Sequence, residues 1–192
     1  KKAVLFTEMI ASQAIYRGDY NKFLKKNSIE EPVVLQVGGS DNELLKFSTN
    51  LANKYGYQGV NLNVGCPSKK VSQGRMGACL MKEADIVRDC IKTMISESSS
   101  EVSVKCRIGV DEFESYNFFK EFISNVSDSG CNTFFVHARK AFLKGLDPKK
   151  NRTLPPLKYD YVYRLKREMP QLNIIINGGI QTLEECNDEM SP

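Results

Sequence analysis

The sequence has no tryptophan, a single histidine, and no apolar run near the roughly 20 residues that span a bilayer. We therefore expect no membrane-spanning segment. The basic and apolar start meets Glu8 too early to be a secretory signal. The six cysteines form no C-x-x-C pair and no paired Cys/His spacing, which argues against a zinc site and predicts no bound metal. These features indicate a soluble protein of a reducing compartment, the cytoplasm or an organellar matrix.

The net charge of +4, from 27 basic and 23 acidic residues, is too small to indicate a nucleic-acid partner by its sum. Its distribution is more informative, because basic residues gather in residues 68–75 (SKKVSQGR) and residues 138–152 (ARKAFLKGLDPKKNR). Composition alone leaves two interpretations open, a solvated loop surface and a surface that binds a polyanion.

Short apolar segments alternate with amphipathic helical patterns along the chain, which predicts parallel strands joined by helical crossovers. One helix is expected to begin at Ser40, where Ser40 and Glu43 have the spacing of a capping box. Further helices are expected over residues 86–94, 119–126 and 159–169, and from Thr182. Strands are expected at residues 3–9, 33–39, 59–65, 102–109, 133–139 and 173–179.

Both a doubly wound sheet and a (β/α)8 TIM barrel satisfy this alternation. The barrel is favoured because polar residues recur at many strand ends, whereas no G-x-G-x-x-G turn of a Rossmann sheet is present. A closed barrel needs eight strands and about 250 residues. We therefore expect residues 1–192 to form a partial barrel of about six β/α units, without its first and last strands. The polar residues at strand ends are Glu8, Gln36, Asn61, Asn63, Lys105, Arg107, His137, Arg139 and Asn177.

Residues 61–68 (NLNVGCPS) place a cysteine directly after a predicted strand. Pro67 disfavours helical backbone at Cys66 and removes the next N–H donor, while Gly65 permits a close approach by a ligand or loop. The thiol is thus expected on a fixed backbone at the barrel end where active sites form. A buried loop cysteine is the alternative, and a reactive thiol there acts either as nucleophile or as general acid.

Two other strands carry residues suited to an anionic ligand. Lys105 lies among apolar neighbours, and a lysine that points into a barrel needs an anion, although an outward-facing lysine also fits the pattern. His137 is followed by Arg139 and Lys140, which favours an anionic ligand over a satisfied core histidine.

The glycines at two strand ends suggest a flat, phosphorylated ligand. Gly178 and Gly179 follow Asn177 where barrels often bind phosphate through backbone N–H groups, although a plain tight turn explains them equally. Gln36 precedes a second glycine pair and offers an amide to the edge of a heterocycle. Together with the thiol and Lys105, these residues fit a flavin mononucleotide (FMN) across the barrel mouth.

Several segments closely resemble the tRNA-dihydrouridine synthases, and the long basic segment resembles the bacterial-type A subfamily. This resemblance covers essentially the whole chain. It implies an FMN-bound (β/α)8 barrel, followed by a small helical tRNA-binding domain, that reduces uridines of the tRNA D-loop with NADPH. The segments that carry it are NLNVGCPSKKVSQGRMGACLM (61–81), VSVKCRIG (102–109), FFVHARKAFLKGLDPKKNRTLPPLKYDYVYRLK (134–166) and INGGI (176–180).

The resemblance assigns roles residue by residue. Cys66 matches the catalytic cysteine, the proton donor. The family's first strand with its Pro-Met flavin contacts, the Gly-Arg phosphate contact of its last strand, and its helical domain have no counterpart in residues 1–192, which puts cofactor and tRNA binding by this segment alone in doubt. The positions that match FMN contacts are Gln36, Lys105, His137, Asn177, Gly178 and Gly179, and those that face tRNA are Asn63, Arg139, Lys140, Lys150 and Arg152.

The resemblance therefore implies a tRNA-dihydrouridine synthase that acts near position 20/20a of the D-loop. Hydride from the flavin would reach C6 of the uracil and a proton from Cys66 would reach C5. Two alternatives stay open, another FMN-dependent barrel oxidoreductase that acts on a free pyrimidine, and a tRNA-binding module without catalysis. No protein partner is predicted.

Overall fold

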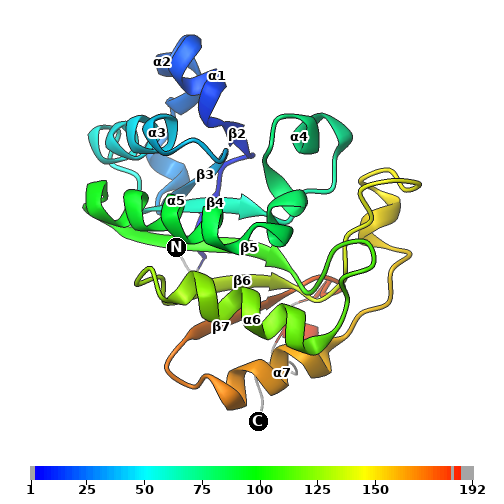
Figure 1. The fold of residues 1–192 in the computed structure, drawn as a ribbon. Coiled ribbons are helices and arrows are strands. Elements are labelled where there is room, and N and C mark those ends of the chain that lie inside the picture. Colours follow the sequence, from blue (N-terminus) through cyan, green and yellow to red (C-terminus); the bar gives the residue numbers. More distant parts are fainter. Residues whose placement is uncertain (1–2, 183, 187–192) are drawn as a thin grey trace.

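The computed structural model describes residues 3–182 and 184–186 and contains a single parallel sheet (Figure 1). The strand order is β1-β3-β4-β5-β6-β7, and β2 also pairs with β3, so that seven strands occupy six positions of a partial TIM barrel. The α/β fold and the barrel predicted from the sequence are thereby confirmed. The strands are β1 (Leu5–Phe6), β2 (Ile10–Ala11), β3 (Val33–Gly38), β4 (Gly59–Val64), β5 (Glu101–Arg107), β6 (Thr133–His137) and β7 (Asn173–Asn177).

Helices connect the strands, and the longer ones pack along one face of the sheet (Figure 1). None of the helices in the described residues is long and apolar enough to cross a membrane. The α-helices are α1 (Ser12–Arg17), α2 (Tyr20–Leu24), α3 (Asn42–Lys54), α4 (Lys69–Gln73), α5 (Ala84–Glu97), α6 (Tyr116–Ser127) and α7 (Tyr159–Glu168), and the 3-10 helices are η1 (Ser28–Glu30), η2 (Gly77–Lys82) and η3 (Lys150–Arg152).

The first strand differs from its prediction as one continuous segment, residues 3–9. Leu5 pairs with Val33 but Ile10 pairs with Val37, so the register shifts by one residue between β1 and β2. An extra residue on one strand of a pair interrupts the ladder and bends the chain. The five other predicted strands are confirmed within one or two residues.

The start of α3 is a second correction. Helix α3 begins at Asn42, and its cap is Asp41, whose side chain accepts a hydrogen bond from Leu44 N. The predicted cap at Ser40, with its capping box to Glu43, was therefore wrong by one position. Serine and aspartate are both suited to capping, but it is the Asp41 carboxylate that accepts from a free N–H of the first turn. The helix predicted from Thr182 lies partly outside the described residues.

The face of the sheet toward the helices is apolar. Because successive side chains of a strand point to opposite faces, alternate residues of each strand enter this layer. Leucine, valine, cysteine and phenylalanine side chains there are at most 6% exposed and form the core with the inner faces of α3, α5, α6 and α7. These core residues include Leu35, Val37, Val60, Leu62, Val64, Val102, Val104, Cys106, Phe134 and Val136.

The opposite, concave face carries most of the buried polar side chains, beside apolar residues such as Val34, Phe135 and Ile175. Seven of the eleven buried polar or charged residues in the described part of the chain lie on it. Buried polar groups are costly unless hydrogen-bonded, so this face carries side chains that a stable core alone does not require. The seven are Gln36, Asn61, Asn63, Ser103, Arg107, Thr133 and His137.

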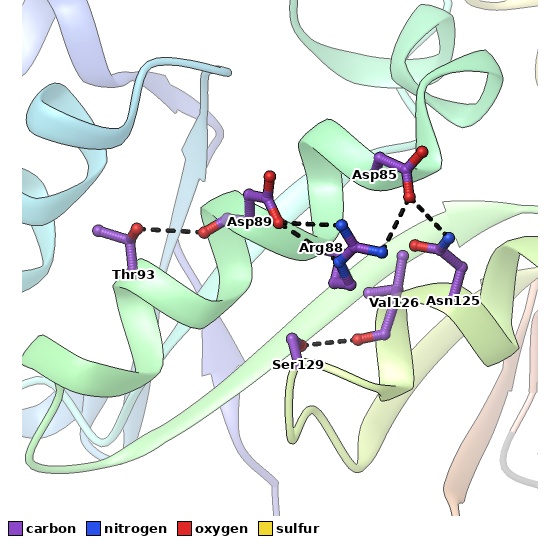
Figure 2. A network of polar contacts seen from close by, with 7 residues as sticks. All are labelled: Asp85, Arg88, Asp89, Thr93, Asn125, Val126 and Ser129. Carbon is purple, nitrogen blue, oxygen red and sulfur yellow. Dashed lines mark hydrogen bonds and ion pairs between the residues drawn. The ribbon is translucent and has the colours of Figure 1, made fainter.

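Polar contacts join neighbouring helices on the outer surface, as Figure 2 shows for α5 and α6. Asp85 accepts a hydrogen bond from Arg88 of its own helix and another from Asn125 of α6, both at 2.9 Å. Arg88 also pairs with Asp89 at 3.3 Å. Exposed ion pairs of this kind contribute little each, and they fix helix orientation on the far side of the sheet from the polar face.

Candidate active site

Cys66 lies where the chain leaves β4 toward α4, and its backbone is held from both sides. Asn63 Oδ1 accepts hydrogen bonds from the backbone N–H groups of Gly65 at 3.1 Å and Cys66 at 2.9 Å. The Cys66 carbonyl accepts a hydrogen bond from Ala78 N at 2.9 Å. Gly77 has a φ of +76°, and a Cβ there would lie 2.4 Å from this carbonyl oxygen. Only glycine therefore allows the η2 segment to close over the cysteine.

A cavity of about 330 Å³ opens beside this thiol at the carboxyl ends of the strands. It brings together eight of the residues that the sequence predicted, and leaves Gln36, Arg139, Lys140 and Lys150 outside its wall. The ends of four strands and the loops after three of them contribute, which is how barrel folds assemble an active site. The wall is formed by Asn63, Gly65, Cys66, Pro67, Lys105, Cys106, Arg107, His137, Pro148, Arg152, Asn177, Gly178, Gly179 and Ile180.

The cavity is positively charged. Lys105 and Arg152 line it, Arg107 lies in its wall, and no aspartate or glutamate lines it within the described part of the chain. Burial lowers the pKa of Lys105, whose Nζ donates a hydrogen bond to Asn177 Oδ1 at 2.8 Å. Burial also lowers the pKa of Arg107 to about 10, so the guanidinium stays charged at neutral pH. Buried cations without a carboxylate partner favour an anionic ligand.

His137 presents an unpaired nitrogen to this region. Its Nε2 atom is buried and has no hydrogen-bond partner among the residues described. Burial, followed by the charges of Arg107 and Lys105, lowers the pKa of His137 to about 3, which leaves a neutral imidazole at pH 7. A buried polar atom without a partner is rare in folded proteins. Its position fits a ligand that offers a hydrogen-bonding group.

Gly178 and Gly179 form a backbone cradle after β7. Their φ values are +100° and +85°, and consecutive backbone N–H groups in such conformations create a concavity suited to anions. A Cβ at Gly178 would lie 2.3 Å from the ring of His137. The glycines therefore let the backbone approach the imidazole, and the cradle lies close to the cations of the cavity.

Arg107 is a buried residue to which the sequence analysis assigned no role. Its Nε donates to Gly65 O at 3.2 Å, and its Nη1 donates to Asn151 O at 2.9 Å and Lys140 O at 3.4 Å. The guanidinium thus joins the loop of Cys66 to the long basic loop. The polar alternation of Ser103, Lys105 and Arg107 along one strand was the signal in the sequence that all three face the same side.

The basic loop is folded around Asn151, which is fully buried. Its Nδ2 donates to Phe142 O at 3.0 Å and to Asp147 O at 3.2 Å, and its Oδ1 accepts from Phe142 N at 2.8 Å. This arrangement brings Arg152 to the cavity wall and leaves Lys150 exposed outside it. The role of Asn151 was not predicted, because its partners are main-chain groups.

Arg139 and Lys140 have protein partners. Arg139 donates a hydrogen bond to Pro155 O. Lys140 forms an ion pair with Glu114 at 2.5 Å, and its Nζ lies 4.6 Å from the centre of the Phe142 ring. These contacts shape the loop, and a direct role of either residue toward tRNA stays a prediction.

The other cysteines of the sheet and helices contrast with Cys66. Burial raises the pKa of Cys90 and of Cys106 to about 12 and that of Cys131 to about 11, so these thiols stay protonated and unreactive. Cys66 is half-buried and faces the cavity. It is the thiol in this region with access to a ligand.

Comparison with known proteins places this chain in a family. The model of the family described as "Dihydrouridine synthase" matches residues 1–192. The chain is 50% identical over 191 residues to a tRNA-dihydrouridine(20/20a) synthase of Yersinia pestis, and this covers 99% of the chain and 55% of the relative. It is 50% identical to the enzyme of that name from Pasteurella multocida and 47% identical to that from Synechocystis, covering 98% and 100% of the chain and 57% of each relative. The chain spans about half the length of these curated relatives.

Proposed function

The chain belongs to the dihydrouridine synthase family, and from this membership and the site we propose that the protein reduces uridines 20 and 20a of tRNA to 5,6-dihydrouridine. The observation that carries the proposal is the half-buried thiol of Cys66, held beside a positively charged cavity at the carboxyl ends of the strands. A thiol on a fixed backbone can deliver a proton to one face of a substrate bound there.

The residues of the cavity fit FMN as the cofactor. Lys105, His137 and Asn177 would contact the cofactor, and the backbone N–H groups of Gly178 and Gly179 would face its phosphate. Gln36 stays a proposed contact as well, although its amide bonds to Asn61 and Asn63. Bound FMN would supply the hydride for C6 of the uracil, and NADPH is the proposed source of these electrons.

Cys66 has the proton that the reaction needs at C5. Reduction of the C5–C6 double bond adds one hydride and one proton, and the thiol would release that proton and regain it from solvent. The anchored N–H and carbonyl of Cys66 restrict the path of Sγ, so the proton reaches one carbon rather than another.

The basic loop is the proposed contact with tRNA. Arg152 at the cavity wall and exposed Lys150 would meet phosphates, with Arg139, Lys140 and Asn63 nearer the base. The target uridine must leave its stack, because C5 and C6 are inaccessible inside folded tRNA. Such an enzyme would work in the cytoplasm or an organellar matrix, where tRNA is found.

The decisive experiment uses unmodified tRNA, FMN and NADPH with the purified protein, and maps dihydrouridine at each position. We expect the modification at positions 20 and 20a and no turnover of free uracil. Turnover of free uracil or dihydroorotate without tRNA reduction would instead identify a free-pyrimidine oxidoreductase. Tight tRNA binding without reduction of any substrate would identify a binding module.

A further inference from the structure

A chain of side-chain hydrogen bonds crosses the concave face and ends at the backbone of Cys66. From Asn63, whose Oδ1 binds the Cys66 N–H, Nδ2 donates to Gln36 Oε1 at 2.8 Å. Gln36 Nε2 donates to Asn61 Oδ1 at 2.9 Å. Asn61 Nδ2 donates to Ser103 Oγ at 3.0 Å. We call Asn63, Gln36, Asn61 and Ser103 the amide ladder.

The backbone N–H groups at Gly65 and Cys66 determine which way each amide side chain in this ladder is turned. The backbone N–H groups of Gly65 and Cys66 can only donate, so the Asn63 atom that faces them must be its oxygen. Its nitrogen then faces Gln36, which must present oxygen in return. The nitrogen of Gln36 is thereby left to donate to Asn61. One set of donors therefore fixes three side chains.

The strand register sets the side chains of the amide ladder beside one another, and burial makes each of their hydrogen bonds necessary. Gln36 lies opposite Asn61 between β3 and β4, and Asn61 lies opposite Ser103 between β4 and β5. Each of the four residues is at most 9% exposed. Since a buried amide without a partner costs about 1–3 kcal/mol, a turned side chain at one position disturbs the next.

We propose that Asn63 and Gln36 are positioning residues for the thiol of Cys66. Asn63 holds the peptide groups on which the thiol is mounted, and Gln36 anchors Asn63 by accepting a hydrogen bond from its nitrogen. This inference rests on the proposed function for the identity of Cys66 as proton donor. It gives both residues a task that needs no contact with flavin or tRNA.

Three substitutions separate this role from direct binding. Asn63→Ala removes the acceptor of two N–H groups. Gln36→Met keeps the length of the side chain but leaves the buried Asn63 nitrogen without its acceptor, which loosens Asn63. Gln36→Glu keeps an oxygen toward Asn63, and Asn61 can turn because the Ser103 hydroxyl donates as readily as it accepts. The conservative Gln36→Glu should therefore retain most of the function that Gln36→Met loses.

The measurements are the rate of Cys66 alkylation by iodoacetamide, followed on its peptide by mass spectrometry, and kcat and KM for unmodified tRNA. For Asn63→Ala and Gln36→Met we expect kcat to fall about 10- to 100-fold, since small displacements of a reacting group cost this much. KM should change by a smaller factor than kcat, even with Asn63 among the proposed tRNA contacts. Alkylation should become at least threefold faster, because a loosened loop presents the thiol to solvent. These opposite shifts distinguish a positioning role from loss of a ligand contact.

The double variant Gln36→Met/Asn63→Ala tests the order of action. If Gln36 acts through Asn63, the double variant should match Asn63→Ala alone in both measurements, a non-additive result. Asn53→Ala is the matched control, since the Asn53 amide also bonds a backbone carbonyl (Glu97) and a backbone N–H (Ser99) but lies at the opposite end of the strands. It should leave alkylation and kcat unchanged.

Several results would overturn the inference. These are additive effects in the double variant, a change confined to KM, and loss of bound flavin with unchanged alkylation. If wild-type protein makes no dihydrouridine, the proposed function fails, while alkylation of the same variants still decides whether Gln36 and Asn63 position the thiol. Thermal unfolding of each variant confirms that the comparison is made on folded protein.

Discussion

The two faces of the sheet are built from the same strands, but one face forms the apolar core and the other carries the polar groups near the cavity. On β5, Val102, Val104 and Cys106 point to the helices, whereas Ser103 and Lys105 point to the concave side. The helix face holds the strands together through apolar burial, about 25 cal/mol for each Å² removed from water. The concave face carries hydrogen-bonded polar groups that end at the cavity. Alternation along a strand thus separates stability from chemistry residue by residue.

Removing one thiol at the cavity and one in the apolar core is the strongest test of this separation. Cys66→Ala should lower the rate of dihydrouridine formation about 10³-fold, the scale of a lost general acid, while unfolding and flavin content stay near those of the wild type. Cys90→Ala should do the reverse, with lower stability and retained activity, since Cys90 is buried in α5 and lies outside the cavity wall. Single-turnover assays and urea unfolding measure both. Full activity of Cys66→Ala would contradict the assignment of the proton donor.

A second test removes an apolar side chain from the helix face. Leu62 is fully buried and lies between two ladder residues on β4. Leu62→Ala should lower the free energy of unfolding by about 3 kcal/mol, through lost burial and a residual cavity. Urea unfolding gives the value, and kcat measured well below the unfolding transition should stay within a few-fold. A loss of kcat as large as that of Asn63→Ala would show that the faces are not separable.

The pH dependence of stability tests the burial and positive charge around His137 on the concave face. Its pKa falls from 6.5 to about 3 on folding, so below pH 6.5 the unfolded chain binds a proton that the folded protein does not. The contribution of His137 to the free energy of unfolding is fully present above pH 6.5 and is lost as the pH falls toward 3. Between pH 7 and pH 5 this amounts to about 2 kcal/mol. His137→Gln should lose about that much less in urea unfolding. Equal losses in both proteins would exclude His137 as the cause.

The smallest effect is expected outside the sheet. Lys150→Ala removes an exposed charge from the basic loop and should change stability by less than about 0.5 kcal/mol. The slope of log affinity for tRNA against log salt should become shallower by about one unit, the value of one phosphate contact. Lys92→Ala, on the exposed side of α5, is the control and should leave the slope unchanged. An unchanged slope for Lys150→Ala would remove this residue from the tRNA surface.

The strands and long helices could be predicted because their apolar periods are unambiguous. Helices α1 and α2 were not predicted, since six and five residues are too short to show a period of 3.6. The one-residue shift between β1 and β2 was missed for a different reason. It depends on pairing with β3, which residues 3–11 do not reveal alone.

The site divides in the same way. Cys66, Lys105 and His137 were found because they end strands and differ chemically from their neighbours, and the structure places all three at the cavity wall. The bonds of Arg107 and Asn151 could not be predicted, because their partners are main-chain groups. Every residue supplies such a group, so no residue type marks these contacts.

Because Arg107 bonds main-chain carbonyl groups, its position between the two loops has an evolutionary consequence. The guanidinium joins two loops through the carbonyl oxygens of Gly65, Lys140 and Asn151, and none of these three bonds uses a side chain of the loops. A side-chain substitution in the loops leaves these three acceptor oxygens in the chain. A new RNA contact can then arise by point mutation while the thiol keeps its place, so selection can retune substrate choice and leave the reaction intact.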